Sequence, residues 1–398
     1  MKELMMFFTT ALAVSVGVCA NGQEAGAIKG GIGEGIGWTT ADSSMDFNFH
    51  FFVQSRADFL SMEHSSGREN QVNGRIQQFR LKFDGFLADP RLTYKLQLEM
   101  SEGKTLMGRE GQNSGVLHEA ILFYRFSDRF QLGMGQAILP GNRQRVNPLP
   151  NTQMMDRSLV NSVFHLDMDF GFHGEYEVFP ERNHSLTLLG AVTTGEGRNW
   201  IQMTRGGLSW TGRMNWLPFG RFIRNSIYAE GDMEGHESPR LLLGAGYNFN
   251  DRAVRFNGQT GGRSVDPRDV ETAFADFIFK YRGWSFLGEF MKRESKELVG
   301  AAPDGEEGFT FAGRGLNVQG GRYFSSGWEI AARYSEVSPD LRILLLTPRQ
   351  REITVGINKY FYGRLIRMQG DVTSYHHRFS GAPAVRGWGI RLQAQVGI

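Results

Sequence analysis

Apolar and polar residues alternate with a period of two over long stretches of this chain, and this period is that of a β-strand. In the first stretch one face carries Phe47, Phe49, Phe51, Val53, Ala57 and Phe59, and the other carries Asn48, His50, Gln54, Arg56 and Asp58. The pattern recurs over residues 92–102 and 387–398. Strands of soluble proteins average about five or six residues, whereas a membrane-crossing strand needs roughly 9 to 11. These long stretches therefore favour a membrane barrel over a soluble sandwich.

The number of alternating stretches predicts the size of the barrel. Seventeen segments alternate, whereas a single-chain bacterial barrel has an even number of strands. Long and short connections also alternate, and this order fails around residues 226–234, so we assign that segment to a long connection from 217 to 239. The all-β prediction is a 16-stranded antiparallel transmembrane β-barrel with long outer loops and short periplasmic turns. Its strands are 45–60, 75–86, 92–102, 117–126, 130–138, 169–179, 184–194, 207–216, 240–249, 272–281, 284–293, 313–323, 328–336, 351–360, 365–375 and 387–398.

Aromatic residues support the placement of the short turns at the periplasmic face of the membrane, because tryptophan and tyrosine gather at membrane interfaces. They flank most of the proposed short turns: Tyr124, Phe126, Phe130, Trp216, Phe219, Tyr281, Trp284, Phe324, Trp328, Tyr360, Phe361 and Tyr362. Both chain termini then lie on the periplasmic side. A barrel of this size leaves an aqueous channel along its axis.

The N-terminal residues predict export. Lys2 is followed by an apolar stretch to Val18 and by a cleavage site of the small-residue type that ends at Ala20, which together indicate a secretory signal peptide over residues 1–20. Residues 21–44 are rich in glycine and are predicted to form a flexible lead-in, and residues 45–398 form the barrel. The exact cleavage position is left open.

Composition narrows the possible functions. The chain has one cysteine and a net charge of +2, which argue against a disulfide scaffold, a cysteine-rich zinc site and general nucleic-acid binding. Of the 44 basic residues, 35 are arginine. The planar donor fork of arginine suits anions, so this bias favours anion contact, although a plain compositional habit explains it equally well.

No recognisable catalytic motif stands in the sequence. His118 and Glu119 begin like a zinc-protease helix, but Leu122 stands where the second histidine is needed. His376 and His377 fall in a proposed outer loop. We expect no enzyme activity, no catalytic residues, no metal and no cofactor. Three other classes of protein are alternatives to a diffusion channel: an outer-membrane hydrolase with a dispersed site, a plugged transporter with more strands than this chain can form, and a secreted binding sandwich.

Four stretches carry a resemblance to a known family: Met45-DFNFHFFVQSRADF, Arg75-IQQFRLKFDGFLADPRLTYKLQLEMS, Phe130-QLGMGQAILPGNRQRVN and Asp156-RSLVNSVFHLDMDFG. From about Gly31 onward the chain resembles phosphate-selective porins of the O and P type. The resemblance implies a 16-stranded barrel in the bacterial outer membrane, in contact with lipid and lipopolysaccharide and assembled as a homotrimer. It also implies an arginine-lined lumen that inward-folded loops constrict.

The expected function is passive diffusion of small hydrophilic solutes through a water-filled channel that favours anions such as phosphate. Strand parity places a basic wall on neighbouring strands: Arg56, Arg80, Lys82, Lys95, Arg125, Arg367 and Arg391. Acidic residues lie on the far side: Glu175, Glu177, Glu289 and Glu329. Because the lumenal charges nearly balance, two alternatives stay open: salt bridges between these lumenal arginines and neighbouring carboxylates, and a general non-selective porin.

The connection between residues 139 and 168 is too long for an ordinary loop, and long ordered loops are usually functional. It carries Arg143, Arg145 and Arg157, which we predict to be constriction residues. Arg143 and Arg145 are two positions apart in a turn-rich stretch and are predicted to face the same side. An external flap or subunit latch is the alternative. The natural solute, the oligomeric state and the set of loops that enter the pore are left open.

Overall fold

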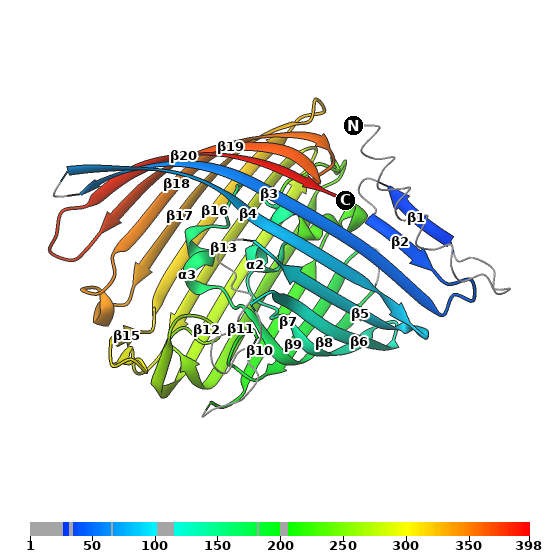
Figure 1. The fold of residues 1–398 in the computed structure, drawn as a ribbon, viewed down its shortest axis with the longest axis horizontal. Helices are drawn as coiled ribbons and strands as arrows, with labels where there is room; N and C mark the ends of the chain where they lie inside the picture. The colour runs from blue at the N-terminus through cyan, green and yellow to red at the C-terminus, as the bar shows by residue number, and fades with distance from the viewer. Residues whose placement is uncertain (1–26, 32–34, 65–66, 102–114, 181–182, 200–205) are drawn as a thin grey trace.

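The computed structural model describes residues 27–31, 35–64, 67–101, 115–180, 183–199 and 206–398. Sixteen strands form a closed antiparallel barrel, in which each strand pairs with the next and β20 pairs back with β3 (Figure 1). The barrel strands are β3 (Met45–His64), β4 (Gly67–Leu87), β5 (Asp89–Glu99), β6 (Leu117–Ser127), β7 (Phe130–Ile138), β8 (Met168–Phe179), β9 (Ser185–Thr193), β10 (Ser209–Leu217), β11 (Arg240–Arg255), β12 (Arg263–Tyr281), β13 (Trp284–Glu294), β16 (Gly313–Tyr323), β17 (Trp328–Pro339), β18 (Arg349–Tyr362), β19 (Ile366–Arg378) and β20 (Val385–Gly397). The predicted 16-stranded fold is confirmed.

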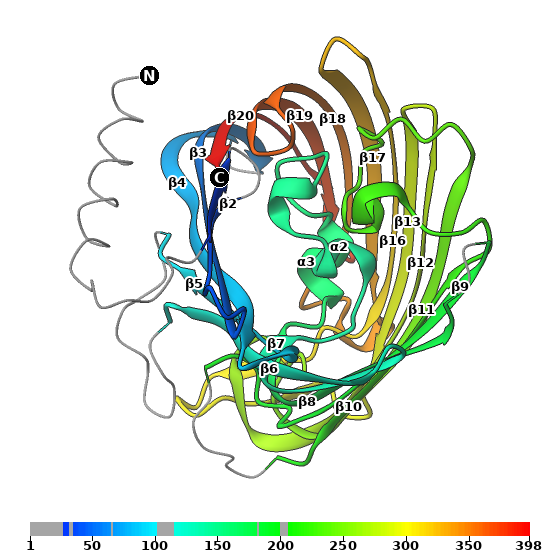
Figure 2. The ribbon, with the colours of Figure 1, turned by 90° about the vertical axis from the view of Figure 1, so that its right-hand side faces the viewer.

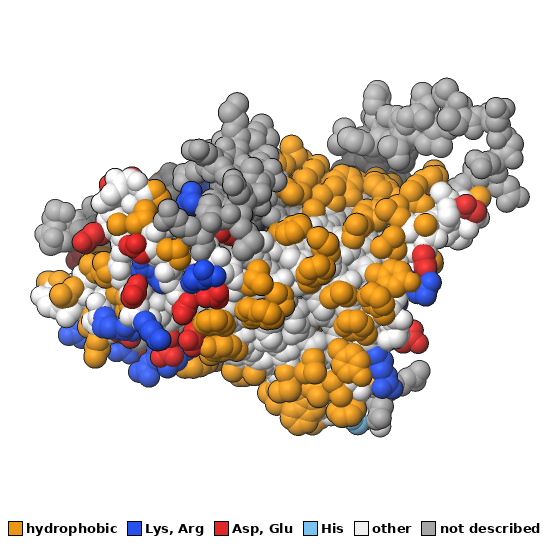
Figure 3. Space-filling model, turned by 90° about the horizontal axis from the view of Figure 1, so that it is seen from below, with side chains coloured by type: hydrophobic (Ala, Val, Ile, Leu, Met, Phe, Trp, Pro, Cys, Tyr) orange, Lys and Arg blue, Asp and Glu red, His pale blue; other side chains and the backbone are white. Residues whose placement is uncertain are grey.

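The alternation of the sequence becomes an apolar outside and a polar inside. In β20, Leu392 is 61% exposed on the outer surface, whereas Gln393 is 3% exposed inside the barrel. Apolar side chains cover a broad part of the outer face in Figure 3, and charged side chains gather at the end that carries the long loops. A surface of this kind suits contact with lipid along the strands and with water at the ends.

Short pieces of other structure lie between the barrel strands. They are α2 (Arg143–Val146), the 3₁₀ helix η1 (Leu149–Asn151), α3 (Leu159–Phe164), η2 (Ile223–Tyr228), η3 (Leu341–Ile343) and the small hairpin of β14 (Val299–Ala301) and β15 (Glu307–Phe309). None of the helices in the described ranges combines the length and the apolar character that a membrane span needs.

The demotion of residues 226–234 from strand to connection is confirmed. This segment lies between β10 and β11; its first three residues complete η2 and the rest form no strand. Just before it, Arg224 and Asn225 have φ values of 50° and 55°, which no strand accommodates. A strand therefore cannot enter the segment from this side, although its sequence alternates.

Strands β3 and β4 extend further than predicted. Strand β3 continues to His64 and β4 begins at Gly67, and these two residues pair, whereas the sequence predicted an outer loop over 61–74. Arg68 through Ile76 are exposed on both faces of β4. An apolar face is what reveals a strand in a sequence, and this projecting hairpin has water on both sides, so its alternation is lost.

The N-terminal segment differs from the predicted flexible lead-in over 21–44. Its described part forms a hairpin of β1 (Ala27–Gly31) and β2 (Gly35–Thr39), which lies at the same end of the barrel as the C-terminus (Figure 1). Strand β20 ends opposite Phe52, and β2 continues along β3 by pairing Ile36 with Phe49. The unpaired edge of β3 supplies this register, and glycine-rich sequence alone gives no sign of it. The predicted signal peptide lies outside the described residues.

Candidate functional site

The connection between β7 and β8, residues 139–167, folds into the barrel and is called the inner loop. Figure 2 shows α2 and α3 of this loop inside the ring of strands. Pro140, two residues after the end of β7, prevents this strand from continuing. Ser158 starts α3 by accepting a hydrogen bond from the Asn161 backbone N–H at 3.1 Å. The predicted inward fold of this segment is what the structure has.

Apolar side chains of α3 anchor the inner loop to one wall. Val160 and Phe164 are fully buried, in a cluster that also contains Phe274 of β12 and Met291 of β13. Gly315 of β16 makes room for the helix, because a Cβ atom there would lie 2.8 Å from Val160 and 3.0 Å from Phe164. The wall and the loop are thus shaped to each other.

Arginines of the barrel wall hold the inner loop by its backbone carbonyls. An irregular segment inside a barrel has carbonyl groups with no strand partner, and these need donors. The donor side chains are buried, and the contacts are Arg213 to Gly141 at 2.8 Å, Arg293 to Val163 and Phe164 at 2.9 Å each, Arg333 to Asp156 at 2.7 Å, Arg367 to Thr152 at 2.7 Å and Arg56 to Met155 at 3.0 Å. Much of the arginine content therefore supports the loop, which is a role that composition does not reveal.

Buried carboxylates hold the donors of the same loop. Glu289 of β13 accepts hydrogen bonds from the Gln144 backbone N–H at 2.8 Å and from Asn142 at 3.0 Å. Glu329 of β17 accepts from the Gln153 side chain at 2.7 Å. These glutamates were predicted as part of an acidic wall that faces solutes, but the loop covers both of them.

The 218–239 connection also enters the barrel, from the opposite end, and meets the inner loop. Glu230 is 1% exposed and accepts hydrogen bonds from the Gln153 backbone N–H at 2.8 Å, from Gln144 at 3.1 Å and from Gln319 of β16 at 2.9 Å. Lys280 of β12 holds the connection itself by donating to the carbonyls of Ser226 and Gly231. The spacing of the alternating segments predicts this connection over 217–239, but nothing in its sequence indicates that it turns inward.

Together these contacts divide the lumen into a covered wall and an open wall. The covered wall consists of the inner faces of β10–β13 and β16–β19, where Lys280, Arg293 and Glu329 are at most 1% exposed. The open wall consists of the inner faces of β4 and β5 around Lys82 and Lys95, whose side chains are 37% and 35% exposed. Water in the barrel therefore reaches this part of β4 and β5.

The three predicted constriction residues point in different directions. Arg143 is 1% exposed and faces the covered wall, where its guanidinium lies 3.2 Å from the Asn215 oxygen. Arg145 forms an ion pair with Asp167, which Arg198 also contacts at 3.0 Å. The prediction that Arg143 and Arg145 face one side is wrong, because α2 places residues two positions apart on opposite sides.

Arg157 turns back onto its own loop and donates to the carbonyls of Gln144 at 2.6 Å and Asn147 at 2.7 Å. Burial lowers the pKa of Arg157 to about 9, and repulsion from Arg145 and Arg80 adds to this shift. Arg80, Arg145, Arg157 and Arg198 therefore form a cationic cluster between the inner loop and the open wall.

Two carboxylates lie beside this cluster. Arg80 pairs with Glu99 at 2.9 Å, and Arg145 and Arg198 share Asp167. Burial by itself would raise the pKa of Asp167, but Arg145 and Arg198 hold it well below its ordinary value, so the group stays ionised. Glu119 also acts on Arg80 and Glu230 on Arg157, so the positive charge of the four guanidinium groups is partly offset.

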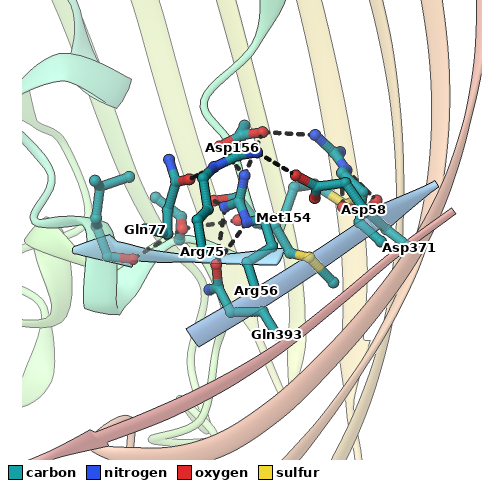
Figure 4. A network of polar contacts seen from close by, with 12 residues as sticks. Arg56, Asp58, Arg75, Gln77, Met154, Asp156, Asp371 and Gln393 are labelled. Carbon is teal, nitrogen blue, oxygen red and sulfur yellow. Dashed lines mark hydrogen bonds and ion pairs between the residues drawn. The ribbon is translucent and has the colours of Figure 1, made fainter. Parts of the chain in front are cut away.

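The remaining members of the predicted basic wall fall into two groups. Arg56, Arg367 and Arg391 hold the inner loop, and Arg56 and Arg391 contact its Asp156 at 2.9 Å and 2.6 Å. Figure 4 shows Asp156 from the loop lying above Arg56.

On the open wall, Lys82 pairs with Asp84 at 2.6 Å and Lys95 pairs with Glu119 at 2.8 Å, whereas Arg125 is exposed near the short-turn end. Arg293 of β13 was not among the residues predicted to face the lumen. It lies four positions from Glu289, on the same face of the same strand, so the alternation could have placed it there.

The fold is similar to that of solved outer-membrane porins. An anion-selective porin from Comamonas acidovorans matches with a TM-score of 0.53 at 8% identity, over 88% of this chain and 99% of that one. The outer membrane channel DcaP of Acinetobacter baumannii matches with a TM-score of 0.53 at 10% identity, over 91% and 99%. OprB of Pseudomonas putida matches with a TM-score of 0.56 at 10% identity, over 89% and 94%.

No protein-family model matches the chain, and no curated protein matches it. The similarity to these porins therefore shows a shared fold. The narrower resemblance to phosphate-selective porins is not confirmed by these matches.

Proposed function

We propose that this protein is an outer-membrane porin, a channel for passive diffusion of small hydrophilic solutes. The observation that carries the proposal is the divided lumen, in which the inner loop is fixed to the covered wall while Lys82 and Lys95 of the open wall stay in contact with water. A barrel of sixteen strands has room for an aqueous channel, and a loop fixed on one side narrows the channel without closing it. The predicted signal peptide, lipid and lipopolysaccharide contacts and homotrimer belong to the same proposal.

The channel favours small anions such as phosphate in this proposal, because the cationic cluster lies where the inner loop faces the open wall. Guanidinium groups bind oxyanions through paired N–H donors. Arg145 and Arg157 of the predicted constriction residues belong to this cluster, whereas Arg143 points from the inner loop to the covered wall and donates to Asn215 there. The second candidate is a non-selective channel, which the ion pairs of Lys82 and Lys95 favour.

Removing charge from the cluster is expected to lower the preference for anions. The Arg145→Gln, Arg198→Gln double variant should reduce the ratio of chloride to potassium permeability, measured from reversal potentials in a planar bilayer under a salt gradient. The control is Arg252→Gln, Arg342→Gln, which removes the same charge from two exposed side chains. Equal shifts in the two double variants would favour the non-selective channel, because a general surface potential acts on both alike.

Glu230 is expected to keep the inner loop still. In Glu230→Ala, the Gln153 backbone N–H loses its acceptor and the Gln144 and Gln319 side-chain amides each lose one of two acceptors, so the single-channel current should fluctuate between several levels instead of one. The matched control is Glu234→Ala in the same connection, because Glu234 pairs with Arg364 and does not contact the inner loop. Equal noise in both variants would show that the loop is held without Glu230.

A further inference from the structure

A polar cavity of about 430 Å³ lies between the inner loop and the inner faces of β4 and β17–β20. Its size falls within the range of small-molecule sites in proteins. The residues that line it are Gln77, Leu149, Asp156, Arg157, Leu159, Asn161, Ser162, Arg333, Glu352, Tyr375 and Arg391.

Most charges at this cavity already have partners. Both carboxylate oxygens of Asp156 accept a hydrogen bond from Nη1 of Arg56 at 2.9 Å, and Oδ2 also accepts one from Arg391 at 2.6 Å. Arg391 also donates to both oxygens of Asp371, at 2.7 Å and 2.9 Å. Figure 4 shows this network around Asp156. These groups are rigid and neutralised, so they shape the cavity more than they attract a solute.

Two opposite charges at the same cavity, Arg333 and Glu352, act on each other but form no ion pair within the described ranges. Arg333 is 4% exposed; its Nη1 donates to the Asp156 carbonyl, while its buried Nε has no acceptor in the described part of the chain. Glu352 accepts no hydrogen bond and forms no ion pair with any described residue. A buried N–H without an acceptor costs about 1 to 3 kcal/mol, so an acceptor supplied to Arg333 would be favourable.

Arg333 and Glu352 are close but do not contact each other. Arg333 of β17 pairs in register with Thr354 of β18, and Glu352 is two positions away from Thr354, so the two are diagonal neighbours on one face. Diagonal neighbours lie about 7 to 8 Å apart. One small molecule that carries both charges can therefore bridge them.

We propose that this cavity is a binding subsite for small zwitterions, in particular free α-amino acids. The solute carboxylate accepts from Nη2 of Arg333, which makes no hydrogen bond within the described ranges, with Arg157 beside it, and the solute ammonium donates to Glu352 and to the Tyr375 hydroxyl. A plain anion is disfavoured by Glu352, and a plain cation is disfavoured by Arg333 and Arg157. The inference rests on the proposed channel function and names a solute class for it.

The test uses the purified full-length protein in a planar bilayer, with potassium chloride as carrier of the current. Glycine added at neutral pH should interrupt the current in a concentration-dependent way and more strongly than sodium acetate or methylammonium chloride. In Glu352→Gln, glycine should bind about tenfold more weakly, whereas acetate should bind no more weakly than before. Glu352→Asp, which keeps the carboxylate, should lie nearer the unmodified protein.

The matched control is Glu294→Gln, which removes an exposed carboxylate at the outer end and should leave the glycine effect unchanged. A change of mobility on heating in a denaturing gel shows whether each variant barrel is folded. Absence of any glycine effect in a normally conducting channel, or a glycine effect that Glu352→Gln leaves intact, would overturn the zwitterion subsite while the channel function stands. Acetate that interrupts the current better than glycine would show a plain anion site instead. A protein that forms no channel in potassium chloride would contradict the proposed function itself.

Discussion

Replacing residues 139–167 with an Asn-Gly turn is expected to raise the single-channel conductance severalfold while the barrel stays folded. The last register pair of β7 and β8 joins Ile138 to Met168, so a two-residue turn can connect the strands directly. The wall groups that hold the inner loop then face water, which hydrates them as well as the loop did. Conductance rises because the loop no longer occupies the lumen. Planar-bilayer recording of the purified variant measures this.

The control shortens an outer connection that does not enter the barrel. Residues 379–384 between β19 and β20 lie mostly exposed at the outer end. Replacing them with the same Asn-Gly turn should leave the conductance close to that of the unmodified protein. If removal of the inner loop left conductance unchanged as well, the narrowest point of the channel would lie elsewhere, and the 218–239 connection would be the next segment to shorten.

Asp276→Ala is expected to destabilise the barrel by about 3 to 5 kcal/mol, because it leaves a buried arginine without its partner. Asp276 accepts two hydrogen bonds from Arg213, at 2.7 Å and 2.6 Å, and lies 3.9 Å from Arg143. All three side chains are at most 1% exposed. Without the carboxylate, two guanidinium groups lie together in a site that water reaches poorly. Reversible urea unfolding in lipid vesicles, followed by tryptophan fluorescence, gives the free energy of unfolding.

Asp89→Ala is the matched control, since Asp89 pairs with Arg91 on the exposed short-turn end. Exposed pairs of this kind contribute about 1 kcal/mol or less. A similar loss of stability in both variants would indicate that water reaches Asp276 freely, and the covered wall would then be more open than its burial indicates.

The strand count and the two faces of each strand could be read from the sequence because a lipid-facing surface and a polar lumen impose opposite chemistry on successive residues. Leu392 and Gln393 differ in exposure as their alternation predicts. A strand cannot be recognised from the sequence where its two faces meet the same environment. The projecting tip of β3 and β4 has water on both faces, and β2 is a glycine-rich strand whose register comes from the free edge of β3.

The candidate site was predictable in part. The length and proline content of residues 139–167 marked a special connection, and the resemblance to a porin family implied that it folds inward. The partners of its residues were not predictable, because each contact joins positions far apart in the chain, such as Arg293 with Phe164 and Glu230 with Gln153. A guanidinium that caps a carbonyl and one that binds a solute look identical in a sequence.

The sequence by itself determined that this protein is an antiparallel barrel of sixteen strands, because alternation, strand length and connection length are local properties. The tertiary structure alone decided which lumenal charges stay in contact with water. Closure of the barrel brings the inner loop against β10–β13 and β16–β19, and burial there converts Arg293 and Glu329 from potential solute contacts into supports of the loop. The charges left unmatched after that closure, at the cationic cluster and at Arg333 with Glu352, follow from packing between distant segments, which no local pattern encodes.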